Sequence, residues 1–240
     1  MRVSQELAYV LHHRDYGETS LLIEMFTRQH GRLGLIAKGA RRARSSLRAA
    51  LIPFQPLTIS FSGGGELPTL SIAEPTRSAP AINGAALFCG LYLNELLLRL
   101  LHRHDPHERL FESYANALGQ LGSNRAPEAV LRVFEKRLLE DIGFGMVLDH
   151  DVQDGAPLQA EQLYRYLPER GPVMAATANS DGIAVHGACL QALANECLEG
   201  ETVLGEAKRL MRALLARQLG ERPLGSRDLF RPQRIANTLE

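Results

Sequence analysis

Cysteine is scarce in this chain of 240 residues. The three cysteines, Cys89, Cys189 and Cys197, are widely spaced, and no two of them form a CxxC pair. Small secreted domains need a denser disulfide framework, and a four-thiolate zinc site needs a fourth cysteine. The sequence therefore excludes both, and we expect a reducing, cytoplasmic location.

The chain also lacks a long apolar segment. No apolar signal core follows Met1, and the most apolar run, near Leu91–Leu101, carries Asn94, Glu95 and Arg99. A helix that spans a bilayer needs about 20 largely apolar residues. We expect a soluble, intracellular protein with no membrane partner.

Acidic residues are missing from one long stretch. The whole chain balances 27 basic against 27 acidic residues, yet no Asp or Glu lies between Glu24 and Glu66. The same stretch holds seven cations, which are Arg28, Arg32, Lys38, Arg41, Arg42, Arg44 and Arg48. A local positive field attracts a polyanion to one region only. The predicted ligand is DNA, bound through its phosphates with little sequence preference; the alternative is a solvated loop without function.

The first third of the chain has strand-like patterning. Five short aliphatic or β-branched runs between residues 6 and 74 are bounded by Gly, Pro, Asp or Asn: LAYVLHHR, TSLLIEMFT, GRLGLIAKG, PFQPLTISFS and LPTLSIAE. RQHGR at 28–32 and SGGGE at 62–66 have the composition of hairpin connections. Five strands in so short a segment predict a small barrel, with the basic stretch between its third and fourth strands. Its few aromatics make base stacking a minor contribution.

Helical periodicity replaces this pattern after Pro80. Apolar residues recur at helical spacing in five segments, at 85–104, 108–121, 127–142, 188–197 and 201–219. Residues 146–185 are rich in Gly, Pro, Asp and Asn, and a short hairpin at 164–174 is the one element we expect there. The predicted fold class is α+β: a five-stranded barrel over residues 1–80, then a mainly α-helical domain over residues 81–240 with an irregular insertion around 146–185.

Two further clusters of cations are candidate binding residues. Lys208, Arg209 and Arg212 could extend the DNA path toward Arg222, Arg227, Arg231 and Arg234, although Glu201, Glu206 and Glu221 also fit a surface helix with ion pairs. Arg132 and Lys136 lie one helical turn apart beside Phe134 and Leu138, an arrangement suited to an acidic, apolar peptide. An ordinary amphipathic helix is the alternative.

Catalytic and metal-binding patterns are absent from the sequence. There is no GxSxG or HExxH motif, SGGGE lacks the Lys-Ser or Lys-Thr of a phosphate loop, and the acids are dispersed. The clusters His102, His104, His107 and Asp149, His150, Asp151 are better explained as surface residues than as metal ligands. We expect no enzymatic activity, no metal and no cofactor.

Several segments together resemble one protein family. They are ETSLLIEMFT at 18–27, GRLGLIAKGARR followed by LIPF at 31–54, YLNELLLRLL at 92–101, FEKRLLEDIGFG at 134–145 and AKRLMRALLARQLGERPLGSRDLF at 207–230. In this order and spacing the chain resembles the RecO family of bacterial recombinational repair mediators, of the proteobacterial type. Many members carry a four-cysteine zinc site in the stretch corresponding to residues 149–185, and this chain does not.

The resemblance implies a function as well as a fold. It implies an N-terminal OB-fold and a helical domain that together act without catalysis at the nucleoid. The implied partners are single- and double-stranded DNA, RecR and the acidic C-terminal tail of single-strand binding protein, and the implied outcomes are strand annealing and RecA loading. A second hypothesis keeps the helical domain as a protein–protein adaptor and makes DNA contact incidental.

Overall fold

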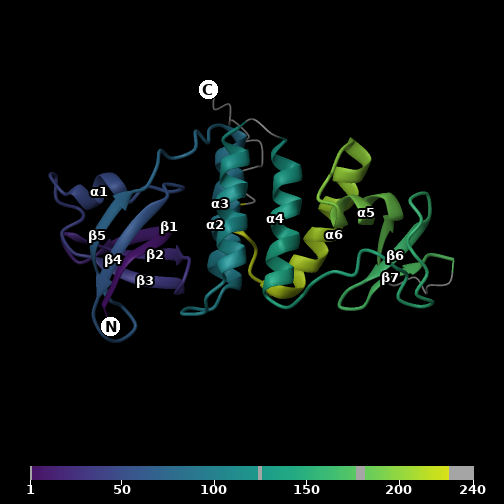
Figure 1. Cartoon of the computed structure of the whole chain (residues 1–240), viewed down its shortest axis with the longest axis horizontal. Helices are drawn as coiled ribbons and strands as arrows, with labels where there is room; N and C mark the ends of the chain where they lie inside the picture. The colour runs from purple at the N-terminus through teal and green to yellow at the C-terminus, as the bar shows by residue number, and fades with distance from the viewer. Residues whose placement is uncertain (1, 124–125, 177–181, 227–240) are drawn as a thin grey trace, which may run out of the picture.

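The computed structural model of this protein describes residues 2–123, 126–176 and 182–226. A β-barrel occupies one end of an elongated molecule, long helices fill the middle, and a small sheet lies at the other end (Figure 1). The amino-terminal strand belongs to the barrel. The α+β class predicted from the sequence is confirmed.

Five strands close the barrel, in the order β1-β2-β3-β5-β4. Their bounds are Arg2–Tyr16 (β1), Ser20–Thr27 (β2), Gly31–Ala37 (β3), Leu57–Ser62 (β4) and Thr69–Pro75 (β5). β1 pairs antiparallel with both β2 and β4, whereas β3 meets β5 in parallel at Ile36 and Thr69. This order and the single parallel contact are those of an OB-fold.

The long first strand can serve two neighbours because it bends. Its pairing register shifts between Val3 and Glu6 and again between Val10 and His12. Such bulges insert an unpaired residue and increase the local twist, which lets one strand curve around a barrel. Alternating side chains then fill the interior, where Val10, Ile23 and Leu35 are fully buried.

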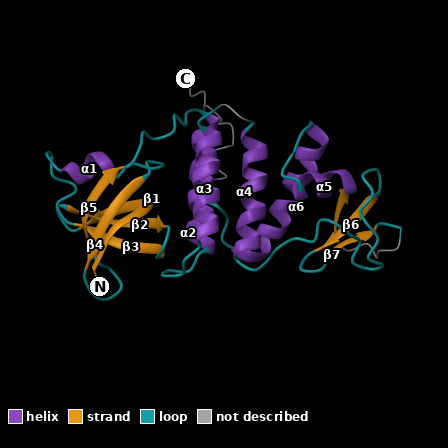
Figure 2. Ribbon diagram, in the orientation of Figure 1, coloured by secondary structure: helices purple, strands orange, loops and turns teal. Residues whose placement is uncertain are grey.

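Helices dominate the rest of the chain (Figure 2). Their bounds are Ser46–Ala50 (α1, on the barrel), Ala85–Leu100 (α2), Glu108–Leu121 (α3), Pro127–Asp141 (α4), Gly187–Ala194 (α5) and Glu201–Leu219 (α6). A three-stranded sheet in the order β7-β6-β8 is formed by Leu163–Leu167 (β6), Gly171–Met174 (β7) and Ile183–His186 (β8). The predicted hairpin near residues 164–174 is β6 with β7.

One predicted helix is too long. The 85–104 prediction overruns α2, which ends at Leu100 because Leu101 is already extended. The chain then runs beside β3, where the amide of His104 donates to the carbonyl of Arg32 at 3.0 Å. Tertiary pairing with the barrel ends this helix four residues before the predicted stop, and the histidines at 102–107 lie in a connection rather than in its last turn.

Beside the core inside the barrel, a second apolar cluster joins the barrel to the helices. Outward-facing side chains of the barrel, including Tyr9, Phe26 and Phe54, belong to the same buried cluster as Phe111 and Tyr114 of α3. The rings of Tyr9 and Tyr114 meet edge to face, with centroids 5.1 Å apart. This packing explains Gly90 on α2, where an added Cβ would lie 2.7 Å from the Phe54 ring. Phe54 is therefore a core residue.

Within residues 2–123, 126–176 and 182–226, no helix combines the length and the apolarity that a membrane crossing requires.

Candidate nucleic-acid interface and peptide pocket

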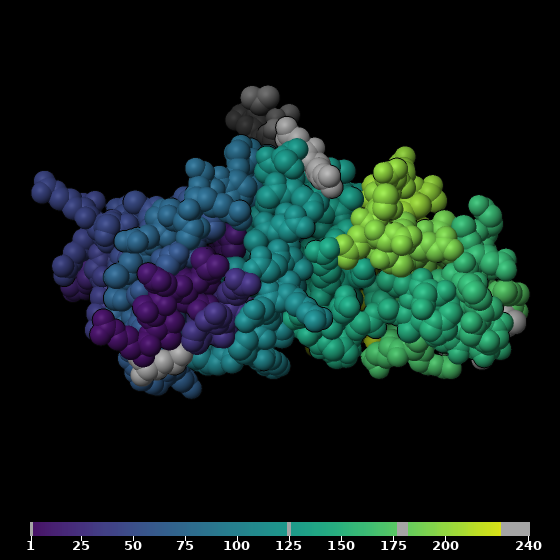
Figure 3. Space-filling model, viewed as in Figure 1, coloured from purple at the N-terminus to yellow at the C-terminus, as the bar shows by residue number. Residues whose placement is uncertain are grey.

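Residues 38–48 run from the end of β3 into α1, which contains Arg48, at the rim of the barrel on the side away from the long helices (Figure 3). The backbone folds into successive turns, with hydrogen bonds from Arg42 to Gly39 and from Ser45 to Arg42. Ala40 is fully buried in the barrel core. We call residues 38–48 the basic loop. Its buried anchor and its turns fix the backbone, so its polar side chains point outward.

Arg41 attaches the basic loop to the turn between β1 and β2. Its guanidinium lies 2.9 Å from the carboxylate of Asp15 and donates to the carbonyls of Gly17 and Glu18 at 3.1 and 3.2 Å. The amide of Arg41 also donates to the carbonyl of Thr19 at 2.9 Å. This arginine is thus a structural clamp as well as a charge.

The other four cations of the basic loop are exposed. Lys38, Arg42, Arg44 and Arg48 form no ion pair with any residue that the structure describes. No acid lies between Glu24 and Glu66 in the sequence to neutralise them locally. Unpaired, solvated cations on a fixed backbone are available to phosphate, and each phosphate contact releases condensed counterions.

Arg28 and Arg32 lie elsewhere, in the junction between barrel and helices. Arg28 pairs with two acids of α3, at 3.3 Å to Glu112 and 3.9 Å to Glu108. Arg32 donates to the carbonyl of Leu98, and its burial lowers the pKa of the guanidinium from the ordinary value. The structure does not bring these two arginines together with the basic loop.

The chain itself covers the outer face of β2 and β3. Glu24 on this face pairs with Arg103, and Gly31 lies directly under Asp105, whose carbonyl oxygen would be 1.9 Å from an added Cβ. Gly31 also has a φ of +66°, so glycine is required twice over. Many OB-folds bind oligonucleotides on this face. Here the connection between α2 and α3 occupies it, whereas the rim of the barrel at the basic loop stays exposed.

Most aromatic rings of the barrel are unavailable for stacking. Tyr9, Phe26, Phe54 and Phe61 are buried, whereas Tyr16, at the end of β1, is 45% exposed. Sequence reasoning did not single out Tyr16. Its position immediately before the Gly17 turn was the signal that it would be exposed.

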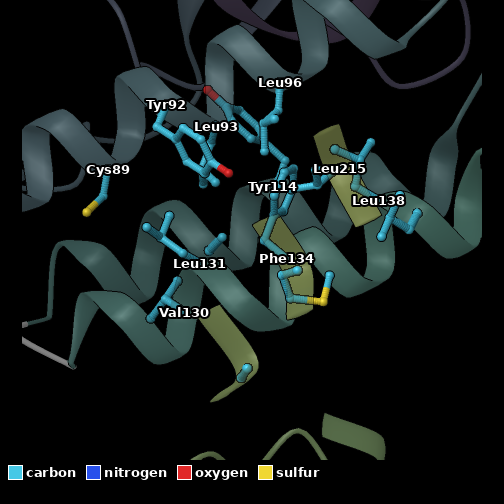
Figure 4. Close-up of a cluster of buried hydrophobic side chains, with 14 of the residues drawn as sticks. Cys89, Tyr92, Leu93, Leu96, Tyr114, Val130, Leu131, Phe134, Leu138 and Leu215 are labelled. Carbon is cyan, nitrogen blue, oxygen red and sulfur yellow. The ribbon is translucent and has the colours of Figure 1, made fainter. Parts of the chain in front are cut away.

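A second site lies between α2, α4 and α6. It is a cavity of about 120 Å³, lined by Cys89, Tyr92, Glu128, Leu131, Arg132, Lys208 and Arg212. We call it the α2–α4–α6 pocket. Figure 4 shows Tyr92 of α2 beside Leu131 of α4, with Cys89 one turn earlier on α2. The lining thus combines an apolar floor with three cations.

Arg132 is the most unusual residue of this pocket. It is only 5% exposed, and its Nη2 lies 2.8 Å from the Oε1 of Glu135, which also accepts a hydrogen bond from the hydroxyl of Tyr92 at 2.6 Å. The Nε and Nη1 of Arg132 are buried without a hydrogen-bond partner among the described residues. A buried donor without an acceptor is costly. The arrangement is suited to an anion that enters the pocket.

Lys208 and Arg212 come to the same pocket from α6. Lys208 donates to the carboxylate of Glu128 at 2.5 Å. That hydrogen bond is the main cause that lowers the pKa of Glu128, and the charges of Arg132 and Arg212 add to it. Arg209 does not line the pocket and lies 3.7 Å from Glu206 on its own helix. The predicted tract of Lys208, Arg209 and Arg212 is therefore divided by the fold.

Lys136 does not join Arg132 in this pocket. Its ammonium group lies 3.1 Å from Glu196, which also pairs with Arg137. These hydrogen bonds, with that of Arg137 first, lower the pKa of Glu196. One helical turn on α4 therefore separates a cation aimed into a cavity from one held against the end of α5.

Two members of the histidine and aspartate clusters, His107 and Asp151, have protein partners. His107 contacts the carboxylates of Asp141 and Asp105. The buried carboxylate of Asp151 accepts from the amides of Gln153 at 2.8 Å and Met174 at 2.7 Å, which closes the loop before β6. No group of three or more His, Cys, Asp or Glu suited to a metal occurs in residues 2–123, 126–176 and 182–226.

The carboxyl-terminal tract is only partly described. Arg227, Arg231 and Arg234, which the sequence placed in a basic tail, lie outside the described residues. The segment before them is held against α2, because Glu95 accepts from the amides of Gly225 and Ser226 at 2.9 and 2.8 Å. Leu224 in this segment is buried as well.

An OB-fold with an acid-free basic rim, joined to a helical unit, is typical of proteins that handle nucleic acids. A family model described as "Recombination protein O N terminal" matches residues 1–79, and one described as "Recombination protein O C terminal" matches residues 83–228. The chain belongs to the RecO family of DNA repair proteins.

Curated relatives agree over nearly the whole length. The chain is 47% identical over 230 residues to the DNA repair protein RecO of Nitrosococcus oceani, covering 96% of this chain and 94% of the relative. It is 48% identical over 230 residues to that of Methylococcus capsulatus, with coverage of 96% and 94%. For Alkalilimnicola ehrlichii the identity is 48% over 234 residues, with coverage of 96% and 92%.

Proposed function

We propose that this protein is a non-enzymatic mediator of DNA repair and recombination that binds single- and double-stranded DNA through the basic loop. Four exposed, unpaired cations on a fixed backbone are the observation that carries this proposal. Contacts to phosphate give affinity without sequence preference. A mediator that meets any gapped DNA needs that property, and we place its action in the cytoplasm at the nucleoid.

Strand annealing follows from the same surface. Two complementary strands repel each other through their phosphates, and a cationic rim that holds both lowers this repulsion. Because the basic loop lies at the end of the molecule, two strands can approach it without contacting the helices (Figure 3). Tyr16, beside the turn that Arg41 clamps, offers an exposed ring to an unpaired base.

DNA titrations test the basic loop. Labelled single-stranded DNA is titrated with wild type and with an Arg42→Ala, Arg44→Ala, Arg48→Ala variant at several salt concentrations. Loss of three phosphate contacts should reduce the slope of log K against log salt by about 2 and weaken binding about ten- to a hundredfold at low salt. Arg41 is left intact because it clamps the loop.

The matched control for this titration removes three exposed arginines elsewhere, Arg109, Arg170 and Arg217. The net charge changes equally in both variants. If both variants lose the same affinity, net charge alone explains the effect and the basic loop is not the interface.

We further propose that the α2–α4–α6 pocket receives the acidic, apolar C-terminal tail of single-strand binding protein. Arg132 supplies unpartnered donors for a carboxylate, Lys208 and Arg212 supply charge, and Tyr92 and Leu131 supply apolar contact. Recruitment through this tail, together with RecR, would place the protein on coated DNA for RecA loading. In this proposal Lys208 and Arg212 bind the peptide rather than extend the DNA path.

Peptide binding tests the pocket. Arg212→Ala should weaken the binding of an acidic peptide with an apolar end about tenfold, because it removes a charged contact at a partly desolvated site. Arg209→Ala is the matched control on the same helix, since Arg209 does not line the pocket. Equal affinities of wild type and Arg212→Ala would show that the peptide binds at another site.

The adaptor function is the second candidate, and the pocket is the observation that favours it. An adaptor would need the α2–α4–α6 pocket for RecA loading but not the basic loop. The Arg42, Arg44, Arg48 variant separates the two candidates: a mediator loses annealing of bare strands, whereas an adaptor keeps it.

A further inference from the structure

We propose that Glu128 is a built-in competitor for the cations of the α2–α4–α6 pocket, and that an acidic ligand must displace its carboxylate in order to reach Lys208. This inference rests on the proposed peptide site. It adds a residue of opposite sign to that site and makes the site selective for ligands with more than one carboxylate.

The first observation is the composition of the lining. Glu128 is the one acid among the residues that line this cavity, and it lies among Arg132, Lys208 and Arg212. A site for an anionic ligand gains nothing in attraction from a resident carboxylate, because like charges repel. Glu128 therefore lowers the affinity of the pocket for the ligand that the cations attract.

The second observation is where the carboxylate lies. Glu128 belongs to the first turn of α4 and Lys208 to α6, so their 2.5 Å hydrogen bond joins two of the three helices that form the pocket. The carboxylate occupies a position at which a ligand carboxylate would find the same ammonium group. Glu128 therefore takes the place that one carboxylate of the ligand would occupy.

The third observation is that this contact can open. The side chains of Glu128 and Lys208 are 53% and 38% exposed. Exposed ion pairs contribute little to folding stability, since water solvates both partners when they separate. An incoming carboxylate can therefore exchange with Glu128 without disturbing the packing of α4 on α6.

The contrast with Arg132 predicts the selectivity. Glu135 holds the Nη2 of Arg132, whereas the buried Nε and Nη1 have no acceptor among the described residues, so a first carboxylate takes these two donors without displacing an acid. A second carboxylate gains Lys208 only by replacing Glu128. A ligand with a single carboxylate reaches Arg132 alone, whereas an acidic segment with neighbouring carboxylates reaches both cations.

Glu128 also has a simpler explanation, which the test must separate. An acid in the first turn of a helix stabilises the helix, because it interacts favourably with the partial positive charge at the helix N-terminus. In that case replacing it lowers the melting temperature slightly and leaves ligand binding unchanged.

The test is fluorescence anisotropy with a labelled ten-residue peptide that carries four aspartates before an apolar carboxyl-terminal dipeptide. The proteins are full-length wild type, Glu128→Gln, Lys208→Met and the double variant, each checked for folding by its melting temperature. Glu128→Gln should tighten binding roughly five- to tenfold, because it releases Lys208 and removes a repulsive charge. Lys208→Met should weaken binding less than about twofold in wild type and about five- to tenfold in the Glu128→Gln background.

The matched control is Glu169→Gln. Glu169 is 59% exposed and lies 3.2 Å from Arg217, another cation of α6, outside this pocket. The Glu169→Gln variant removes the same charge from a comparable ion pair, and we expect it to bind the peptide as tightly as wild type does.

Three results would overturn the proposal. Glu128→Gln could bind the peptide no more tightly than wild type, or as tightly as the Glu169→Gln control. Lys208→Met could also weaken binding by the same factor in both backgrounds. Glu128 would then act on the ligand only by charge repulsion and not by occupying Lys208. If wild type and Glu128→Gln both fail to bind, the peptide site itself fails; if Glu128→Gln alone binds, the site stands and the competitor role is confirmed.

Discussion

The basic loop and the α2–α4–α6 pocket both gather cations, yet they present them in opposite ways. Lys38, Arg42, Arg44 and Arg48 are exposed and have no carboxylate partner in the part of the chain that the structure describes. Arg132 is buried against Glu135, and Lys208 is held by Glu128. One region offers a diffuse field and the other a fixed geometry.

This difference separates two kinds of recognition. Solvated cations attract any phosphate chain, and salt weakens that attraction. A buried guanidinium with fixed neighbours accepts a ligand of one shape and depends less on salt, since apolar contact and desolvation share the binding energy. In the proposed function, the same residue type therefore serves affinity in the basic loop and selectivity in the pocket.

The largest expected effect concerns stability. Glu135→Gln leaves the Arg132 cation buried without its charged partner, so we expect a loss of about 3 kcal/mol in the free energy of unfolding. The Arg42, Arg44, Arg48 alanine variant should lose less than about 0.5 kcal/mol, because those side chains are exposed. Urea denaturation of both variants measures the difference. Equal losses would show that the two regions do not differ in the way the structure indicates.

A companion variant checks the cause. Replacing both members of the pair, as Glu135→Gln with Arg132→Met, removes the buried charge altogether and should recover part of the lost stability. No recovery would mean that Glu135 acts through packing rather than through charge.

The next largest expected effect is a difference in salt dependence between the two regions. Between about 50 and 200 mM salt, DNA affinity at the basic loop should fall about tenfold to a hundredfold, as expected for several phosphate contacts. Peptide affinity at the pocket should fall by less than about fivefold over the same range. Anisotropy titrations with both ligands on the same wild-type protein give the comparison. Parallel salt slopes would assign both ligands to the same kind of surface.

Local patterns predicted most of the elements. α3 spans the predicted residues and α6 does too, because each has a continuous apolar stripe bounded by Gly or Pro. The barrel strands followed from short β-branched runs between turn residues. β8 was missed, since four residues give too little periodicity to distinguish a strand from a loop.

Partnerships between distant residues were beyond sequence reasoning. Nothing near Arg28 in the sequence indicates that acids of α3 will meet it, and the spacing of Arg132 and Lys136 suggested one groove where the structure shows two environments. The acid-free stretch predicted where the positive charge lies. Which of its arginines remain unpaired depends on how the helices pack on the barrel.

The smallest expected effect concerns pH. The pKa values of Glu128 and Glu196 are lowered from 4.5, chiefly by hydrogen bonds from Lys208 and Arg137. A carboxylate with a lowered folded-state pKa contributes stability that is complete above the unfolded value and is lost as the pH falls through the folded value. The urea midpoint of wild type should therefore decline as the pH falls below about 4.5. The Glu128→Gln, Glu196→Gln variant should decline less steeply, by under about 1 kcal/mol in total, because both pairs are partly exposed.

Lys38, Arg42, Arg44 and Arg48 contribute nothing to this acid limb, because none of them has a carboxylate partner among the described residues, unlike Arg41. The Arg42, Arg44, Arg48 variant should therefore follow the wild-type pH profile. A change in that profile would show that one of these three arginines interacts with a carboxylate. It would weaken the proposed role of the basic loop, because cations already neutralised within the protein release fewer counterions from DNA.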